Sequence, residues 1–119
     1  MSDKVEPFSQ IEIEKRAVEI AKVFAQKSFN LVNSEPEELF FREFSKRIAL
    51  REFKLKEAKQ LNDPELIKLN QEAFERMTDQ IEPLAKVFAL EKKSEWLNIA
   101  KEAASGVISI ALKATLGLG

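Results

Sequence analysis

Apolar residues recur along the chain at intervals of three and four, and this period predicts helices over almost its whole length. No run alternates apolar and polar residues for long enough to favour a strand. Polar or proline-containing stretches break the pattern at residues 33–36, 61–64, 82–83 and 91–94. We therefore expect an all-α fold, a single-domain helical bundle of four to five helices over residues 9–116. A flexible arm (1–8) precedes it, and a frayed end (117–119) follows it.

The predicted helix near residues 35–61 is the longest, and it carries apolar side chains on two opposite faces. At about 100° per residue, one face is an ordinary core stripe made of Phe40, Phe41, Phe44, Ile48, Leu55 and Ala58. On the far side, where a one-sided helix would be uniformly polar, apolar residues alternate with charged ones: Leu39, Arg42, Lys46, Leu50, Phe53 and Glu57. Either neighbouring helices cover both faces, or the second face is a docking surface.

Short motifs mark the ends of the predicted helices. Ser34 and Glu37 have the spacing of a capping box, in which each side chain bonds to the backbone N–H of the other residue. Asn62 or Asp63 is the expected cap of the following helix. Pro83 disfavours the helical conformation of the residue before it, so we expect a kink or a short interruption at this point.

The composition excludes most familiar active-site chemistry. The chain has no Cys, no His and no Tyr, which excludes thiolate and imidazole nucleophiles, metal and haem sites built from Cys or His, and disulfides. We therefore expect no cofactor, no catalytic residues and no enzymatic activity. The 19 basic and 20 acidic residues give a net charge of −1, so the whole chain is not a basic nucleic-acid binder. The first ten residues lack the apolar run of a secretory signal, and we expect a cytoplasmic protein.

Carboxylates offer one alternative, a Mg²⁺-dependent nucleotide hydrolase, because hard cations need only oxygen ligands. Two sets of acidic residues have suitable spacing: Glu35 with Glu38, and Glu72 with Glu75, Asp79 and Glu82. The first set is equally explained by the preference of helix N-termini for negative charge. The second set projects away from the apolar side of its helix, whereas metal ligands in a bundle core point inward. We expect no metal site.

Residues 46–59 and 103–119 suggest two other kinds of partner. The first segment carries six basic and two acidic residues and is the candidate for contact with a nucleic-acid backbone. Its basic residues spread around most of the helix, however, and no recognised nucleic-acid-binding motif accompanies them. The second segment is strongly apolar, but about 24 Å of helix is shorter than the roughly 30 Å hydrocarbon core of a bilayer. Nucleic acid is the weaker alternative, and we do not expect a membrane partner.

Protein–protein interaction is the leading hypothesis, with the chain acting as an adaptor, a chaperone-like protein, an inhibitor or a structural subunit. Its basis is the second face of the long helix together with the last predicted helix, which is mostly apolar. Self-association into a homodimer or a larger assembly is its simplest form, because a twofold interface uses one patch twice. The candidate partner-binding residues are Leu39, Arg42, Lys46, Leu50, Phe53, Trp96, Val107 and Ile110. The sequence leaves open whether the last helix packs within the chain or against another.

Overall fold

The computed structural model describes residues 10–27, 34–90 and 93–117, and all regular structure within them is helical. These residues form α1 (Gln10–Lys27), α2 (Glu35–Gln60), α3 (Pro64–Glu75), the 3₁₀ helix η2 (Met77–Gln80), α4 (Ile81–Val87) and α5 (Ser94–Leu116). The predicted all-α bundle with a long helix near residues 35–61 is confirmed. The predicted arm lies outside the described residues. Of the predicted frayed end, only Gly117 is described, and it ends α5 in a left-handed conformation.

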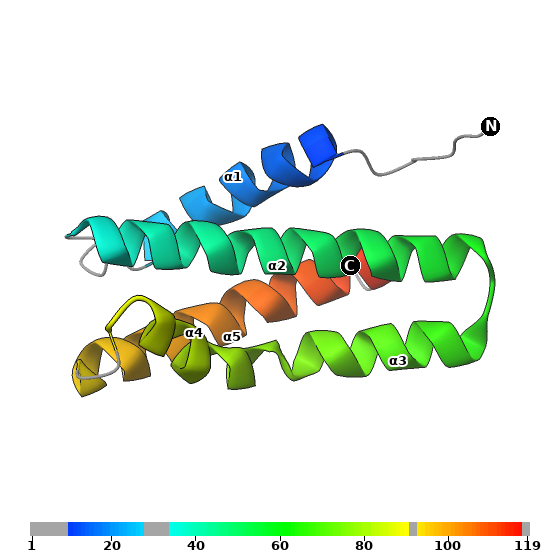
Figure 1. Ribbon diagram of the computed structural model, residues 1–119. Helices are drawn as coiled ribbons and strands as arrows, with labels where there is room; N and C mark the ends of the chain where they lie inside the picture. The colour runs from blue at the N-terminus through cyan, green and yellow to red at the C-terminus, as the bar shows by residue number, and fades with distance from the viewer. Residues whose placement is uncertain (1–9, 28–33, 91–92, 118–119) are drawn as a thin grey trace.

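The long helix α2 runs the length of the molecule, which measures 45 × 27 × 24 Å (Figure 1). Along one side α1 crosses it obliquely, and along the other α3 returns antiparallel after a short turn (Figure 1). The chain continues through η2 and α4, and α5 then passes behind α2 in this view. The other helices are therefore arranged around α2.

Aromatic side chains from several helices meet along the N-terminal half of α2 and form the centre of the core. The ring of Phe40 on α2 lies 5.1 Å from that of Trp96 on α5 and 6.5 Å from that of Phe88, just after α4. Phe24 of α1 reaches the same cluster, with its ring 5.0 Å from Phe41. Tilted and edge-to-face pairs at such distances contribute about 0.5–1.5 kcal/mol each beyond the burial of their area. All six residues of the predicted core stripe on α2 are buried.

Glu37 is buried, and the predicted capping box does not form. Ser34 occupies the N-cap position of α2, but its side chain makes no capping hydrogen bond. The Oε2 atom of Glu37 accepts a hydrogen bond of 2.8 Å from Nζ of Lys93, immediately before α5. Without the Ser34 hydrogen bond the box is incomplete, so the prediction was wrong. The cation of Lys93 neutralises the buried carboxylate, whose charge would otherwise be costly to remove from water. The ion pair joins the starts of α2 and α5.

A tight turn connects α2 to α3. Asn62 has a φ of 54°, a left-handed conformation that Asn tolerates better than most residues. The backbone N–H groups of Asn62 and Asp63 bond to carbonyls in the last turn of α2. The carboxylate of Asp63 also caps α3, accepting hydrogen bonds of 3.1 Å and 3.2 Å from the N–H groups of Glu65 and Leu66. The predicted cap at this position is confirmed.

The interruption expected at Pro83 lies earlier in the chain, so that prediction was wrong. Helix α3 ends at Glu75, η2 follows, and α4 begins at Ile81. Pro83 therefore lies in the first turn of α4. Backbone N–H groups in a first turn have no acceptor within the helix, so the missing N–H of proline costs nothing there.

The turn that follows α4 contains Ala89, the second described non-glycine residue with a positive φ, at 58°. The N–H of Ala89 bonds to the carbonyl of Lys86 at 3.1 Å, and that of Leu90 bonds to the carbonyl of Ala85 at 2.8 Å. This pair of bonds is a Schellman motif, in which the left-handed residue is most often Gly. The side chains of Ala85 and Leu90 are both buried, so the motif turns the chain while keeping both in the core.

Glu52 is a second buried carboxylate of α2, and Arg16 of α1 neutralises it. The Nε and Nη2 atoms of Arg16 donate to the two carboxylate oxygens at 2.7 Å and 2.8 Å, a bidentate geometry. These hydrogen bonds raise the pKa of Arg16 above its ordinary value, and partial burial opposes the shift. Because a raised pKa favours the charged form, Arg16 stays protonated throughout the pH range in which proteins are studied. The pair fixes α1 against α2.

Helix α5 packs within the chain. Its buried side chains are Trp96, Leu97, Ala100, Ala103, Ala104, Val107, Ile108, Ala111 and Thr115. None of the helices in the described ranges combines the length and the apolar character that crossing a bilayer requires.

Candidate interaction surface

The side of α2 that faces away from the core remains accessible to solvent. We call it the α2 outer face and define it by the residues Leu39, Arg42, Lys46, Leu50 and Phe53. Leu39 is 37% exposed and Leu50 is 42% exposed. Arg42 is exposed, whereas Lys46 and Phe53 are half-buried. The described helices therefore do not cover the second face of α2, although they bury the first.

The neighbours of α2 contact its other sides. The buried ion pair of Glu52 ties α1 to one flank. On the other flank, Nη1 of Arg47 donates a hydrogen bond of 3.2 Å to Oε1 of Gln80 in η2. Behind α2, Nζ of Lys59 donates to the carbonyl oxygen of Thr115 in α5 at 2.9 Å. In Figure 1, α2 passes in front of α5, with α1 and α3 to either side, so no described helix crosses the side of α2 that is turned towards the viewer.

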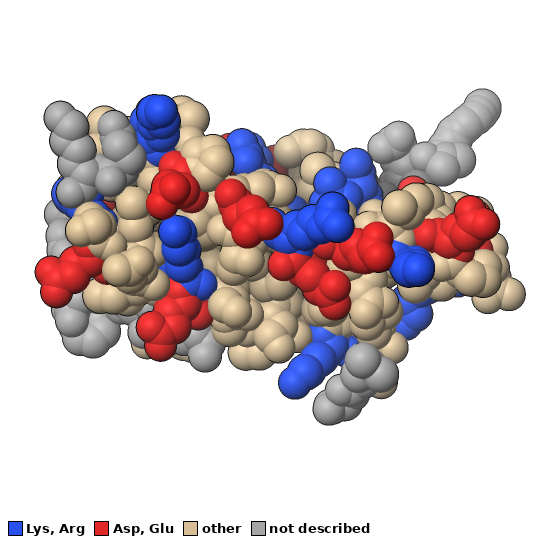
Figure 2. Space-filling model, turned by 90° about the horizontal axis from the view of Figure 1, so that it is seen from below, with Lys and Arg blue, Asp and Glu red and all other residues tan. Residues whose placement is uncertain are grey.

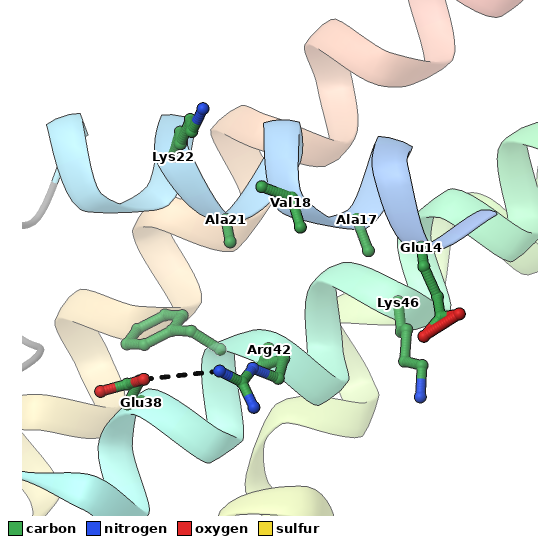
Figure 3. Close-up of a pocket in the computed structure, with 9 residues that line it drawn as sticks. Glu14, Ala17, Val18, Ala21, Lys22, Glu38, Arg42 and Lys46 are labelled. Atoms are coloured by element: carbon green, nitrogen blue, oxygen red, sulfur yellow. Dashed lines mark ion pairs between the residues drawn. The ribbon is translucent and has the colours of Figure 1, made fainter. Parts of the chain in front are cut away.

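A groove of about 650 Å³ lies between α1 and α2, beside the outer face. Its apolar lining consists of Ala17, Val18, Ala21 and Phe41. The side chains of Ala17 and Ala21 on α1 point across the gap towards α2 (Figure 3). The small alanine side chains leave space that larger ones would fill. Arg42 and Lys46 line the groove as well as the outer face, so the two features form one continuous surface.

The charges around the groove are of mixed sign. Its charged lining residues are Glu14, Lys22, Glu38, Arg42 and Lys46. Nη2 of Arg42 lies 3.6 Å from Oε1 of Glu38, one turn away on the same helix (Figure 3). Both side chains are well exposed, so this pair adds little stability. Glu14 extends from α1 beside Lys46 of α2 at one end of the groove (Figure 3). Such a rim does not favour a ligand of strong single-sign charge.

Three of the candidate residues lie elsewhere, on α5. Trp96 and Val107 are buried, because α5 turns its apolar side inward to the aromatic core, so neither belongs to a surface. Ile110 is 56% exposed. It is not brought to the outer face, because α5 packs on the opposite, buried side of α2. The structure thus places five of the eight candidates together.

The basic residues of segment 46–59 point to different sides of α2. Arg47 contacts Glu43 at 3.3 Å as well as η2, and Lys59 reaches back to α5. Lys56 places its Nζ atom 5.4 Å from the ring centroid of Phe53. Figure 2 shows the molecule from below, the side on which α3 and α4 lie in Figure 1, and there too basic and acidic side chains are interspersed. The arrangement is unlike the continuous basic surface that backbone contact with nucleic acid uses.

Two of the six acidic residues considered as magnesium ligands, Glu38 and Glu82, lie beside cations of their own chain. Oε1 of Glu82 lies 3.2 Å from Nζ of Lys101 on α5, and Glu38 pairs with Arg42. Among the described residues, no three acidic side chains are grouped closely enough to hold a metal ion.

The groove and the two buried carboxylates were not predicted from the sequence. A signal for the groove existed, because Ala17 and Ala21 put two small side chains one turn apart on the same face of α1. The burial of Glu37 and Glu52 left no local signal, since their cations lie 56 and 36 residues away.

No family model, curated protein or solved structure matches the chain.

Proposed function

We propose that the protein is a non-enzymatic protein–protein interaction or assembly module that docks its partner on the α2 outer face. The observation that carries the proposal is the exposure of Leu39 and Leu50 on a helix whose other sides are covered. Single exposed apolar residues are normal on a protein surface. These two share one face of the central helix, and they lie beside Arg42 and Phe53, residue types that often carry interface energy.

The groove beside the outer face supports the same proposal. An interface gains most from side chains that fill well-defined depressions on the partner. The apolar lining formed by Ala17, Val18 and Phe41 is suited to an apolar anchor side chain, and the exposed charges around it form a polar rim. Interfaces commonly have this organisation, an apolar centre surrounded by charged and polar groups.

Site-specific photo-crosslinking in cells that produce the protein tests the proposal. A benzoylphenylalanine side chain in place of Leu50 should yield a discrete protein adduct. The same replacement at Leu69, which is 61% exposed on α3, is the matched control and should yield none. An adduct at position 50 that nuclease digests would support a nucleic-acid partner instead. No adduct, or the same diffuse products from both positions, would contradict docking on this face.

A further inference from the structure

The outward positions of α2 have the spacing of a coiled-coil seam. The residues Pro36, Leu39, Glu43, Lys46, Leu50 and Phe53 are separated by three and four positions in alternation, and we call them the seam. All six are exposed or half-buried. This is the spacing of the a and d positions at which two helices pack side by side, crossing at about 20°. The seam is therefore shaped for another helix with the same spacing.

The charges at the middle of the seam distinguish between the ways in which two copies of α2 could pair. In a parallel pair, Glu43 would face Glu43 and Lys46 would face Lys46. In an antiparallel pair, the twofold axis can pass between Phe44 and Ser45 of each copy. The a positions of one copy then face the d positions of the other. Each Glu43 then meets Lys46 of the second copy. Like charges across an interface are unfavourable, so the antiparallel arrangement is selected.

The apolar positions agree with that register. The same twofold axis sets Leu39 opposite Leu50 of the second copy. It sets Pro36 opposite Phe53 of the second copy. A shift by one heptad in either direction would instead place Glu43 and Lys46 against apolar residues, leaving charges without partners in the interface. One register thus matches apolar with apolar and acid with base throughout.

We propose that the partner on the α2 outer face is a second copy of this chain, paired antiparallel through the seam. The inference rests on the proposed function and names its partner. Glu14 of α1 lies beside Lys46, but Lys46 makes no ion pair with the described part of its own chain, so it can pair with Glu43 of the second copy. Glu43 keeps its contact with Arg47 at 3.3 Å, because a carboxylate accepts from more than one cation. The described neighbours of α2 lie behind and beside the seam, so the second helix has room (Figure 1).

Sedimentation equilibrium with charge-reversed variants tests the pairing over about 1 µM to about 1 mM protein. The wild-type chain should form a dimer. In the Lys46→Glu dimer, Glu43 of each copy would face a glutamate at position 46 of the other copy. In the Glu43→Lys dimer, Lys46 of each copy would face a lysine at position 43. The twofold axis repeats each repulsive contact, so it occurs twice in the dimer. Each variant should lower the association constant by about tenfold or more. Lys68→Glu, the same change at an exposed position of α3, should leave the association constant unchanged.

Mixing the two variants distinguishes loss of the contact between residues 43 and 46 of the two copies from misfolding of either variant. In a mixed dimer, both central contacts again join opposite charges, so an equimolar mixture should associate as tightly as the wild-type chain. A wild-type chain that stays monomeric over the whole range would overturn the proposal. A mixture that associates no better than the separate variants would overturn it as well.

Disulfide trapping gives a second measurement, and the absence of Cys from the chain removes any background. Under mild oxidation, a mixture of Leu39→Cys and Leu50→Cys chains should form disulfides between the two variants faster than either variant forms them with itself. Faster homodisulfides would indicate parallel pairing and would overturn the antiparallel register.

The failure of this inference is distinguishable from failure of the proposed function. A monomeric wild-type chain, together with a discrete photo-adduct at position 50 of a mass other than twice the chain, would retain the interaction module and exclude the second copy as its partner. The lack of any adduct would contradict both.

Discussion

Ala89 holds a backbone conformation that costs an L-amino acid with a Cβ atom about 1–2 kcal/mol. Burial of Leu90 and its hydrogen bond to Ala85 offset that cost. The same pentapeptide, AKVFA, occurs at residues 21–25, where it continues as helix. The residues that follow the two pentapeptides differ, because Gln26 is exposed on α1 whereas Leu90 is buried in the core after the turn.

Replacing Ala89 by Gly should stabilise the protein. Gly adopts the left-handed conformation without strain, but it also has more freedom in the unfolded chain, so we expect a net gain of about 0.5–1 kcal/mol. Chemical denaturation monitored by circular dichroism measures the change. Ala73→Gly, inside α3, is the control and should lose about 1 kcal/mol. A loss at both positions would show that the turn at Ala89 is not strained.

Arg16→Leu should destabilise the protein because it leaves the carboxylate of Glu52 buried without its cation. We expect a loss of about 2 kcal/mol, less than for a wholly buried pair, because the side chain of Arg16 is 35% exposed. The midpoint of urea denaturation measures it. The double variant Arg16→Leu/Glu52→Leu should recover most of the lost free energy of unfolding, because it also removes the buried carboxylate that has no cation. A double variant as unstable as the single one would mean that packing of the Arg16 stem is the main contribution.

Helix α2 has one face in the core and one face exposed to solvent. Two of its leucines lie on different faces, so replacing each in turn compares the two environments. Leu55 is fully buried, whereas Leu50 is on the outer face. Leu55→Ala should cost about 2–5 kcal/mol through lost burial and the cavity left behind, and Leu50→Ala less than about 1 kcal/mol. Thermal melts at a protein concentration low enough to keep the chain monomeric make the comparison. Equal losses would mean that the outer face is covered in the folded monomer.

The sequence predicted the helices and the core stripe of α2 because both depend on local geometry alone. Whether the outer face is covered depends on where α1, α3 and α5 pack, and no local pattern encodes that. Trp96 and Val107 were assigned to a surface because apolar side chains suit a core and an interface equally well. The sequence predicts a capping role for Glu37 because its ion-pair partner, the exposed Lys93, lies far away in the sequence. These errors fall where distant segments meet, whereas the one at Pro83 is local, because a proline fits the first turn of a helix as well as a break.

At the scale of the whole molecule, antiparallel pairing through α2 predicts a compact dimer. The seam lies along the 45 Å axis, so two copies would sit side by side. Small-angle X-ray scattering of the dimer should therefore give a longest dimension well below twice that length. A value near twice that length would mean that the copies meet end to end, and it would exclude the seam as the interface.

Asp63 takes part in two helix ends at once, since its N–H closes α2 and its carboxylate opens α3. The turn therefore contains no residue that is free of both helices. As a result, the orientation of α2 about its axis determines the orientation of α3 about its own axis. One residue inserted after Asn62 would rotate α3 by about 100° and carry Phe74, now fully buried, towards water. Among descendants of this chain, the length of the other connections should vary before the length of this turn does.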